Sequence, residues 1–242
     1  MPPQHGAWAM LALPFVLGTW AAGWSWWCGV LLVAWFSGYL LSYFALLAIK
    51  TRRTRRYRSP LSLYGGTLLV TGAICTLHAP WLLLAAAGFA VFFAVNAWFA
   101  RMHNDRHWFN GVVSATAASL MVLVAFGFAS DARSVEELRA LDWQVPTDLF
   151  DLCWLYLVGS VLFVKTMIRE AGNRQFLWWS IGFHALALLV VFRISTWLLI
   201  PFGCYLARAA LLPRVRLRPA HVGAVELVNM VMLVGFSVAV VM

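Results

Sequence analysis

The sequence predicts an all-α, polytopic integral membrane protein with about nine transmembrane helices. Of its 242 residues, 63% are hydrophobic and 11% are charged, whereas about 25% of the residues of a soluble domain carry charge. The 14 Trp and 17 Phe add more apolar bulk than a soluble core of this size can bury. No polar stretch is long enough to fold alone, so we expect a single transmembrane helical domain over residues 1–242.

The apolar segments set the number of spans, because a helix needs about 20 apolar residues to cross the hydrocarbon core. The third and seventh segments, like the first, are short or interrupted, so eight spans remain an alternative. Proline flanks several segments, because it lacks the backbone N–H that a residue inside a helix donates and is therefore better tolerated at helix ends. The expected spans are 7–22, 28–49, 61–77, 80–100, 108–129, 148–168, 175–192, 195–212 and 221–241.

Charged residues are distributed unequally between the two sides that nine spans create. The side of the N-terminus receives 15 of the 18 Lys and Arg residues, and the other side receives six of the nine acids. Lys and Arg remain on the cytoplasmic side, so we expect a cytoplasmic N-terminus and an extracytoplasmic C-terminus. Basic loops attract anionic lipid heads, which explains the net charge of +9 without a nucleic-acid partner.

Two connecting segments have distinct patterns. TRRTRRYRSP, residues 51–60, holds five arginines beside the bilayer; it favours membrane topology and lipid binding, or direct contact with an anionic partner. In the long connection 130–148, Ser134 followed by Glu137 predicts a capping box and a short amphipathic helix. The four cysteines show no metal-binding spacing and are expected to be inert, membrane-buried thiols.

RMHNDRH, residues 101–107, is a dense group of ionisable side chains between two spans. If the helix continues through it, His103 and His107 share one face at i, i+4, a spacing that suits a metal. Two histidines do not complete a metal site, and no third ligand lies nearby in the sequence. We therefore predict no metal site here and expect these histidines to take part in polar packing at the membrane interface. Asn104 and Asp105 are also candidates for capping the fifth span.

KTMIREAGNR, residues 165–174, continues the sixth span. Lys165 and Arg169 share a helical face with Gly172 or Asn173. Two cations one turn apart repel each other unless an anion or an acid lies between them. The pattern favours a bound phosphate, an acid partner from another segment, or side chains that extend to lipid phosphates.

Glu226 lies inside the ninth span, where a carboxylate is costly and is expected to be paired or functional. Its candidate partners are Arg169, Arg101 and His5, and a structural salt bridge is the alternative to a functional one. His184 lies within the seventh span and is either a hydrogen-bonded core histidine or a ligand.

Four segments together resemble the YwiC-like family of bacterial membrane proteins. They are PPQHGAWAMLALPF at the N-terminus, RMHNDRH, KTMIREAGNR and RPAHVGAVE, and the resemblance covers nearly the whole chain. It implies a location in the bacterial cytoplasmic (inner) membrane. It does not imply a particular activity.

A weaker, fold-level resemblance is to the UbiA prenyltransferase superfamily, which implies a UbiA-like bundle with a pocket open to the cytoplasm. Its members hold magnesium and a prenyl diphosphate with two Asp-rich motifs. A motif begun at Asn104 would need Asp where this chain has Trp108 and Val112. The second motif position holds Lys165, Arg169 and Arg174 instead, so Arg and Lys would have to bind a phosphate directly.

These observations favour a membrane protein with a basic, cytoplasmic-side polar pocket. We expect it to bind membrane lipids and an isoprenoid, quinone-like or phosphorylated lipid, with prenyl transfer left open. The alternatives are a small transporter that uses Glu226 and His184, and an accessory subunit with a membrane-protein partner. The candidate ligand-binding residues are His5, Arg101, His103, Asn104, Asp105, Lys165, Arg169, Glu170, Asn173 and Glu226.

Overall fold

The computed structural model describes residues 5–215 and 217–241, and the side chains from residue 10 onward. Helices α1 to α10 and three short 3-10 turns make up this part of the chain, in which there is no strand. The helices are α1 (His5–Ala22), α2 (Trp26–Thr51), α3 (Arg58–His78), α4 (Leu82–Arg101), α5 (Trp108–Ala129), α6 (Val135–Ala140), α7 (Gln144–Ile168), α8 (Arg174–Ile194), α9 (Leu199–Leu211) and α10 (Pro219–Val240). The 3-10 turns are η1 (Thr54–Tyr57), η2 (Thr196–Leu198) and η3 (Leu212–Arg214).

The helices confirm the all-α, polytopic membrane class. Within the described residues, eight helices are long and apolar enough to cross a membrane, and Met10–Ala22 of α1 is a shorter apolar helix. The predicted span 108–129 matches α5, and 195–212 corresponds to η2, α9 and η3 in succession. The sixth span begins earlier than predicted, at Gln144, so Pro146 lies in the first turn of α7, where proline is tolerated.

The predicted Ser134 cap forms at α6, while the return bond of the capping box comes from the residue before the cap. Ser134 Oγ accepts a hydrogen bond from the backbone N–H of Glu137 at 3.1 Å, and the N–H of Arg133 donates to Glu137 Oε2 at 2.8 Å. The cysteines are all free, but only three are buried. Cys204 is exposed on the surface of α9, inside the candidate membrane span 196–214, so its burial in the membrane stays a prediction.

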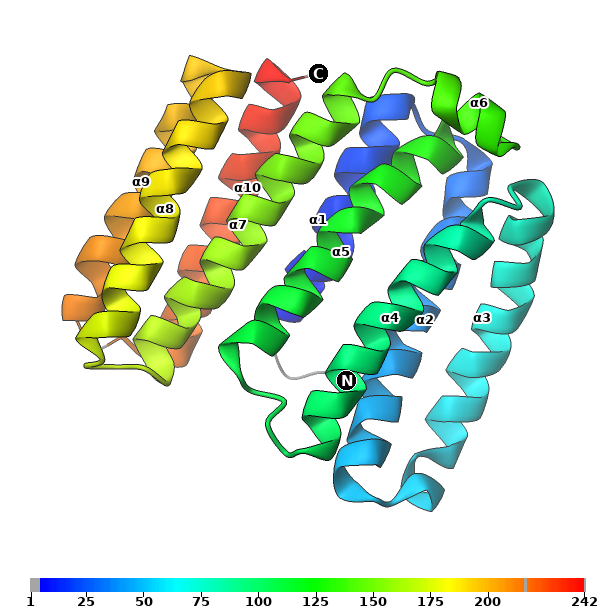
Figure 1. Ribbon diagram of the computed structural model, residues 1–242, viewed down its shortest axis with the longest axis horizontal. Helices are drawn as coiled ribbons and strands as arrows, with labels where there is room; N and C mark the ends of the chain where they lie inside the picture. Colours follow the sequence, from blue (N-terminus) through cyan, green and yellow to red (C-terminus); the bar gives the residue numbers. More distant parts are fainter. Residues whose placement is uncertain (1–4, 216, 242) are drawn as a thin grey trace.

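Helices α1 and α5 form the centre of the bundle. Figure 1 shows α2, α3 and α4 on one side of this pair and α7 to α10 on the other. The close approach of α1 to α5 depends on Gly18, because a Cβ atom there would collide with the carbonyl oxygen of Val122. Leu17 and Val122 belong to the core shared with α7 to α10, while Phe15 and Ala125 belong to the core shared with α2 to α4.

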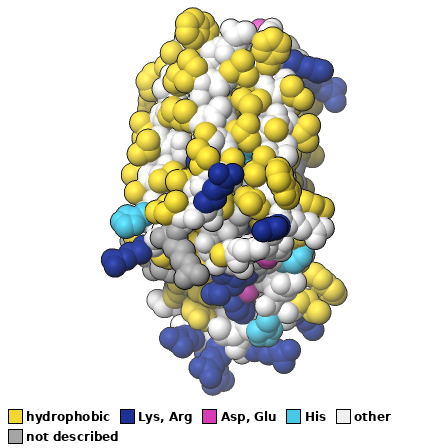
Figure 2. All heavy atoms as spheres, turned by 90° about the vertical axis from the view of Figure 1, so that its left-hand side faces the viewer, with side chains coloured by type: hydrophobic (Ala, Val, Ile, Leu, Met, Phe, Trp, Pro, Cys, Tyr) yellow, Lys and Arg dark blue, Asp and Glu magenta, His cyan; other side chains and the backbone are white. Residues whose placement is uncertain are grey.

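The two ends of the bundle differ in charge. We call one end the basic end; it carries the connections 52–57, 102–107, 169–173 and 212–218, and it is the lower end in Figure 1. Figure 2 shows the face of α8 and α9: apolar side chains cover its upper part, and Lys, Arg and His gather toward the basic end. We call the other end, with the connections 23–25, 79–81, 130–143 and 195–198, the opposite end.

Candidate functional site

The most deeply buried charges form a pair among α7, α9 and α10. Arg208 Nη1 is bonded to Glu226 Oε1, and the two side chains are only 5% and 12% exposed. Ser160 Oγ of α7 donates to the second carboxylate oxygen of Glu226, and Arg208 Nη2 lies 3.3 Å from the same hydroxyl. The three side chains therefore form one connected polar group inside the bundle, as a buried charge pair requires.

Aromatic rings surround the Arg208 guanidinium. Its central carbon lies 4.8 Å from the ring centre of Phe163, 5.1 Å from Tyr205 and 5.8 Å from Tyr156. These distances are in the range of cation–π attraction, which is larger for a cation removed from water. The Tyr156 hydroxyl also donates to the backbone carbonyl of Glu226 at 2.8 Å. The rings and the carboxylate together compensate for the removal of the cation from water.

The partner of Glu226 differs from the three that the sequence suggested. Arg101 and Arg169 are exposed at the basic end, and the side chain of His5 lies outside the described residues. The partner is Arg208, one of the 15 Lys and Arg residues that nine spans place on the side of the N-terminus. It meets Glu226 because α9 and α10 are antiparallel neighbours. Positions 208 and 226 are equally distant from Leu217 in the connection between them, as are Tyr205 and Asn229, whose hydroxyl and carbonyl oxygens are 2.9 Å apart.

His184 is a buried histidine in contact with α7. Its Nδ1 lies 2.7 Å from the backbone carbonyl of Ser180, one turn earlier in α8. Its Nε2 faces Gly159, where a Cβ atom would lie 2.9 Å away, and has no hydrogen-bond partner among the described residues. The ring is thus held by its own helix and packed against the neighbouring one, an arrangement that favours the core reading.

The RMHNDRH segment is a loop and not a continuation of the fourth span. Helix α4 ends at Arg101, and His103 has a φ of 54°, in the left-handed region. His103 and His107 therefore do not share a helical face, and that prediction was wrong. The cap of α5 is also different from the expected Asn104 or Asp105: His107 Nδ1 accepts a hydrogen bond from the N–H of Phe109 at 3.3 Å.

Asp105 forms an ion pair with Lys50, one of the 15 Lys and Arg residues on the side of the N-terminus. Lys50 Nζ, at the end of α2, lies 2.8 and 3.0 Å from its two carboxylate oxygens. The carbonyl oxygen of Asp105 accepts a further hydrogen bond from Asn110 Nδ2 at 2.8 Å. In the described residues, moreover, no group of three His, Cys, Asp or Glu side chains is arranged to hold a metal ion.

Lys165 connects two of the predicted segments. Its ammonium group donates to the backbone carbonyl of Arg106, which holds the end of α7 against the loop between α4 and α5. Helix α7 ends at Ile168, the predicted end of the sixth span, so it does not continue through KTMIREAGNR as expected; Gly172 has a φ of 89° in the turn to α8. Arg169 lies just beyond the helix end and is exposed to solvent.

A small cavity lies at the turn between α7 and α8. Its volume is about 160 Å³. Asn173 Oδ1 caps α8 by accepting from the N–H of Phe176, and Asn173 Nδ2 donates to Glu170 Oε2 at 2.9 Å. The residues that line the cavity are Thr166, Glu170, Gly172, Asn173, Arg174, Leu177 and Pro213. Two predicted ligand residues, Glu170 and Asn173, thus line one cavity.

The predicted site therefore divides into two parts. Lys165, Arg169, Glu170 and Asn173 lie at or near the α7–α8 turn of the basic end, and Lys165 also contacts the loop that holds Arg101, His103, Asn104 and Asp105. Glu226 lies apart from them, within the α7–α9–α10 cluster. Sequence reasoning missed Arg208, although a lone arginine inside an apolar run was a visible signal.

Comparison with known proteins gives three related results. The family model described as YwiC-like protein matches residues 1–126. The Bacillus subtilis protein named "Uncharacterized protein YwiC" is 33% identical over 186 residues, which is 77% of this chain and 74% of that protein. A Haemophilus influenzae protein, named only "Uncharacterized protein", is 28% identical over 224 residues, 92% of this chain and 90% of its own length. No solved structure matches the chain significantly.

Proposed function

Since the chain belongs to the YwiC-like family and is built of membrane-spanning helices, we propose a function within the bacterial membrane. In this proposal the protein binds an amphipathic lipid, which is an isoprenoid, a quinone-like molecule or a phosphorylated lipid. The polar head of this lipid lies at the α7–α8 turn of the basic end. The observation that carries this proposal is the cavity at that turn, which is lined by polar groups and has Arg174 in its wall.

The chemistry of the cavity fits a small polar head. A volume of about 160 Å³ corresponds to roughly five water molecules at about 30 Å³ each, which is room for a phosphate or a small ring but not for a long chain. Arg174 can bind such a head with its planar fork of donors, and Arg169 is exposed on the same turn. Glu170 is already engaged by Asn173, which leaves the arginines available.

The tail would lie outside the cavity, on the lipid-facing surface. Ile168 is exposed at the end of α7, and Trp178 and Trp179 are exposed on the first turns of α8. The ring of Trp179 lies 6.3 Å from that of Trp108 at the start of α5. An aromatic surface at this level is typical of the membrane interface, where the head of a lipid meets its chain.

The proposal includes an orientation for the protein. We place the basic end, with the N-terminus, in the cytoplasm and the C-terminus outside, because Lys and Arg remain on the cytoplasmic side. Arg208 is buried and no longer counts as a loop charge, but the strongly basic connection 52–58 keeps the asymmetry. Of two reporters fused to the C-terminus, one that is active only outside the cytoplasm should give a signal, and one that is active only inside should give none.

The proposal is one of binding and contains no prenyl-transfer step. Magnesium diphosphate is held by carboxylate oxygens, and the two acids at the basic end are engaged: Asp105 by Lys50 and Glu170 by Asn173. If the UbiA resemblance reflects a shared fold, the engagement of these acids favours a relative that retains lipid binding without this chemistry.

Native mass spectrometry of the full chain in detergent tests the proposal. The probes are farnesyl phosphate, decylubiquinone and farnesol, which separate the phosphate, the quinone ring and the bare chain. Because a hydrogen bond to a charged group is worth about 1.5–3 kcal/mol, Arg169→Gln with Arg174→Gln should weaken binding of the phosphate probe by about tenfold or more. Arg139→Gln with Arg193→Gln, the same charge change at two exposed residues of the opposite end, is the matched control. Equal binding by both double variants, or none by the wild type, would overturn the proposal.

A small transporter is the second candidate, and the Arg208–Glu226 pair favours it. Ionisable residues inside a membrane bundle often belong to a substrate or proton pathway, and His184 packs on the same helix, α7, that supplies Ser160. Proton flux into proteoliposomes, followed with a pH-sensitive dye, should disappear in Glu226→Gln and His184→Ala. Flux that persists in both variants would exclude these residues as coupling groups.

A further inference from the structure

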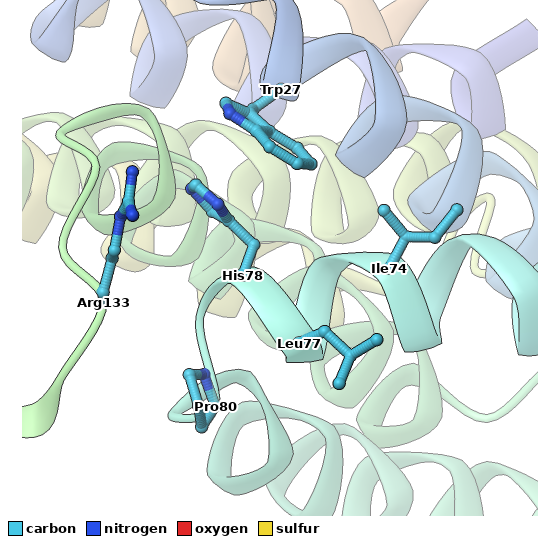
Figure 3. A pocket seen from close by; sticks show the side chains of 6 residues that line it. All are labelled: Trp27, Ile74, Leu77, His78, Pro80 and Arg133. Atoms are coloured by element: carbon cyan, nitrogen blue, oxygen red, sulfur yellow. The ribbon is translucent and has the colours of Figure 1, made fainter.

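A second cavity lies at the opposite end of the bundle, on the other side of the spans from the basic loops. Its volume is about 620 Å³ and it is open on one side. Trp27 comes from α2, Ile74, Leu77 and His78 from α3, Pro80 from the α3–α4 turn, and Arg133 from the α5–α6 connection. Figure 3 shows Trp27 and Arg133 beside His78, with Ile74 and Leu77 along α3.

The polar side of this groove is a chain of three ionisable groups. His78 Nε2 lies 2.8 Å from Asp131 Oδ1, and Arg133 Nη2 donates to Asp131 Oδ2 at 3.1 Å. The hydrogen bond from Arg133, with a contribution from His78, holds the pKa of Asp131 below its ordinary value. A guanidinium has five N–H donors, so the remaining ones are available to a ligand.

The groove is built from groups that other contacts hold in place. The ring of Trp27 stacks on His78 with the centroids 4.1 Å apart, and Trp26 stacks on Trp27 at 3.9 Å. The indole N–H of Trp81 donates to the carbonyl of Ala132 at 2.7 Å, which fixes the backbone next to Arg133. These contacts hold the aromatic side of the groove and the backbone beside Arg133, whose side chain is itself 61% exposed.

The apolar side of the groove continues along the membrane-facing surface of α3. Leu77 is 84% exposed, and Ile74 and Val70 are also exposed. Their spacing of three and four residues places them on one helical face. The groove thus has a polar mouth at the end of the spans, beside the exposed indole of Trp26, and an apolar track that runs into the bilayer.

We propose that this groove binds a zwitterionic phospholipid, with its phosphate on the Arg133 guanidinium, its ammonium group beside Asp131, and one acyl chain along Leu77 and Ile74. Tryptophans at the ends of spans mark the depth of the headgroups, so the phosphate of a lipid reaches Arg133. The carboxylate of Asp131 lies 3.1 Å from that guanidinium and would repel a headgroup whose charge is only negative. This site is independent of the proposed ligand at the basic end.

Native mass spectrometry with defined lipids tests the inference on the full chain. The probes are phosphatidylethanolamine, phosphatidylglycerol and a galactosyl diacylglycerol that has no phosphate. We expect phosphatidylethanolamine to be retained best and the galactolipid least. Arg133→Gln should reduce retention of phosphatidylethanolamine about tenfold, since a charged hydrogen bond is removed, while Arg139→Gln on α6, exposed and outside the groove lining, should leave retention unchanged.

Two further variants keep the test decisive. Asp131→Asn removes the negative charge at a residue with a φ of 57°, which asparagine also tolerates, and should shift the preference toward phosphatidylglycerol. Leu77→Gln changes an exposed apolar side chain and should weaken retention even if Arg133→Gln is unstable. Equal retention of all three lipids, a wild-type preference for phosphatidylglycerol, or unchanged retention in both Arg133→Gln and Leu77→Gln would overturn the inference.

Discussion

The RMHNDRH loop and the Arg208–Glu226 pair use charged residues in opposite ways. The loop holds five ionisable side chains in seven positions, yet most of them are exposed, and His107 acts as a helix cap. The pair consists of two isolated charges in apolar helices, which are bonded to each other and are only 5% and 12% exposed. A dense group of charges therefore marks the end of the bundle, whereas an isolated charge in an apolar run marks its interior.

The difference has an energetic basis. An ion pair near water gains little, because solvent screens it and two flexible side chains must be held in place. A buried pair is costly to form, but removing one partner leaves an uncompensated charge in an apolar interior. The four predictions below test this comparison, and they are given in order of the expected effect.

Removing one member of the buried pair should have the largest effect. Glu226→Ala leaves the Arg208 cation without its carboxylate, and we expect a loss of about 3–5 kcal/mol of unfolding free energy. Replacing both residues together, as Arg208→Met with Glu226→Met, should cost less than Glu226→Ala alone, because no charge is then left buried. Unfolding in mixed micelles measures both, with Glu136→Ala at an exposed acid of α6 as control. A loss no greater than that of the control would refute the comparison.

Adding a methyl group next to His184, by Gly159→Ala, should cause the next largest loss of stability. The Cβ of Gly159→Ala would lie 2.9 Å from His184 Nε2, and the ring is held by its contact with Ser180. Overpacking of this kind costs about 1–3 kcal/mol. Gly182→Ala, where the added atom meets open space, is the matched control, and thermal unfolding should show no loss there. Similar melting temperatures for the two variants would mean that the interior is less tightly packed.

The partly exposed pair at the basic end should contribute less. Lys50 and Asp105 are 31% and 32% exposed, so solvent screens their attraction, and Asp105→Asn should cost less than about 1 kcal/mol. The loss should shrink further in high salt, because salt screens exposed charges. Unfolding measured at low and high ionic strength gives both values. A salt-independent loss as large as that of Glu226→Ala would show that this pair is effectively buried.

The smallest effect is expected from the exposed pair at the opposite end, and it depends on pH. The folded-state pKa of Asp131 is lowered from its ordinary value of 3.8 by Arg133 and His78. The carboxylate therefore contributes stability above pH 3.8, and this contribution is lost as the pH falls through the lower folded value. The wild type should lose slightly more stability than Asp131→Asn between pH 5 and pH 3. An equal loss in both proteins would show that Asp131 does not contribute.

The sequence predicted the spans well because an apolar run of sufficient length is a local signal. The range 108–129 coincides with α5, and Ser134 forms the expected cap of α6. The predicted spans 80–100 and 148–168 end within one residue of α4 and α7, but the helices do not continue through RMHNDRH and KTMIREAGNR as expected, because the chain turns at His103 and Gly172, where φ is positive. Local patterns thus predict where a helix exists more reliably than whether it continues into a polar segment.

Pairings between helices were predicted less well, because sidedness alone does not tell which residues meet. The sequence indicated that Glu226 must be paired, but it suggested loop cations in place of Arg208. The groove at the opposite end had no local signal at all, because four separate segments supply its lining. Asn173 and Glu170 were predicted as ligand residues, and their lining of a cavity keeps that prediction open to test.

Mass spectrometry of the lipids that copurify with the full chain tests the central claim most directly, namely that the basic end binds a lipid head while the buried pair is structural. The proteins to compare are the wild type, Arg169→Gln with Arg174→Gln, and Arg208→Met with Glu226→Met. We predict that an isoprenoid, a quinone or a phosphorylated lipid other than the phosphatidylethanolamine of the Arg133 groove copurifies with the wild type, is lost from the first double variant and is retained by the second. Retention by the first variant with loss from a folded second variant would contradict the account and assign the site to the bundle interior.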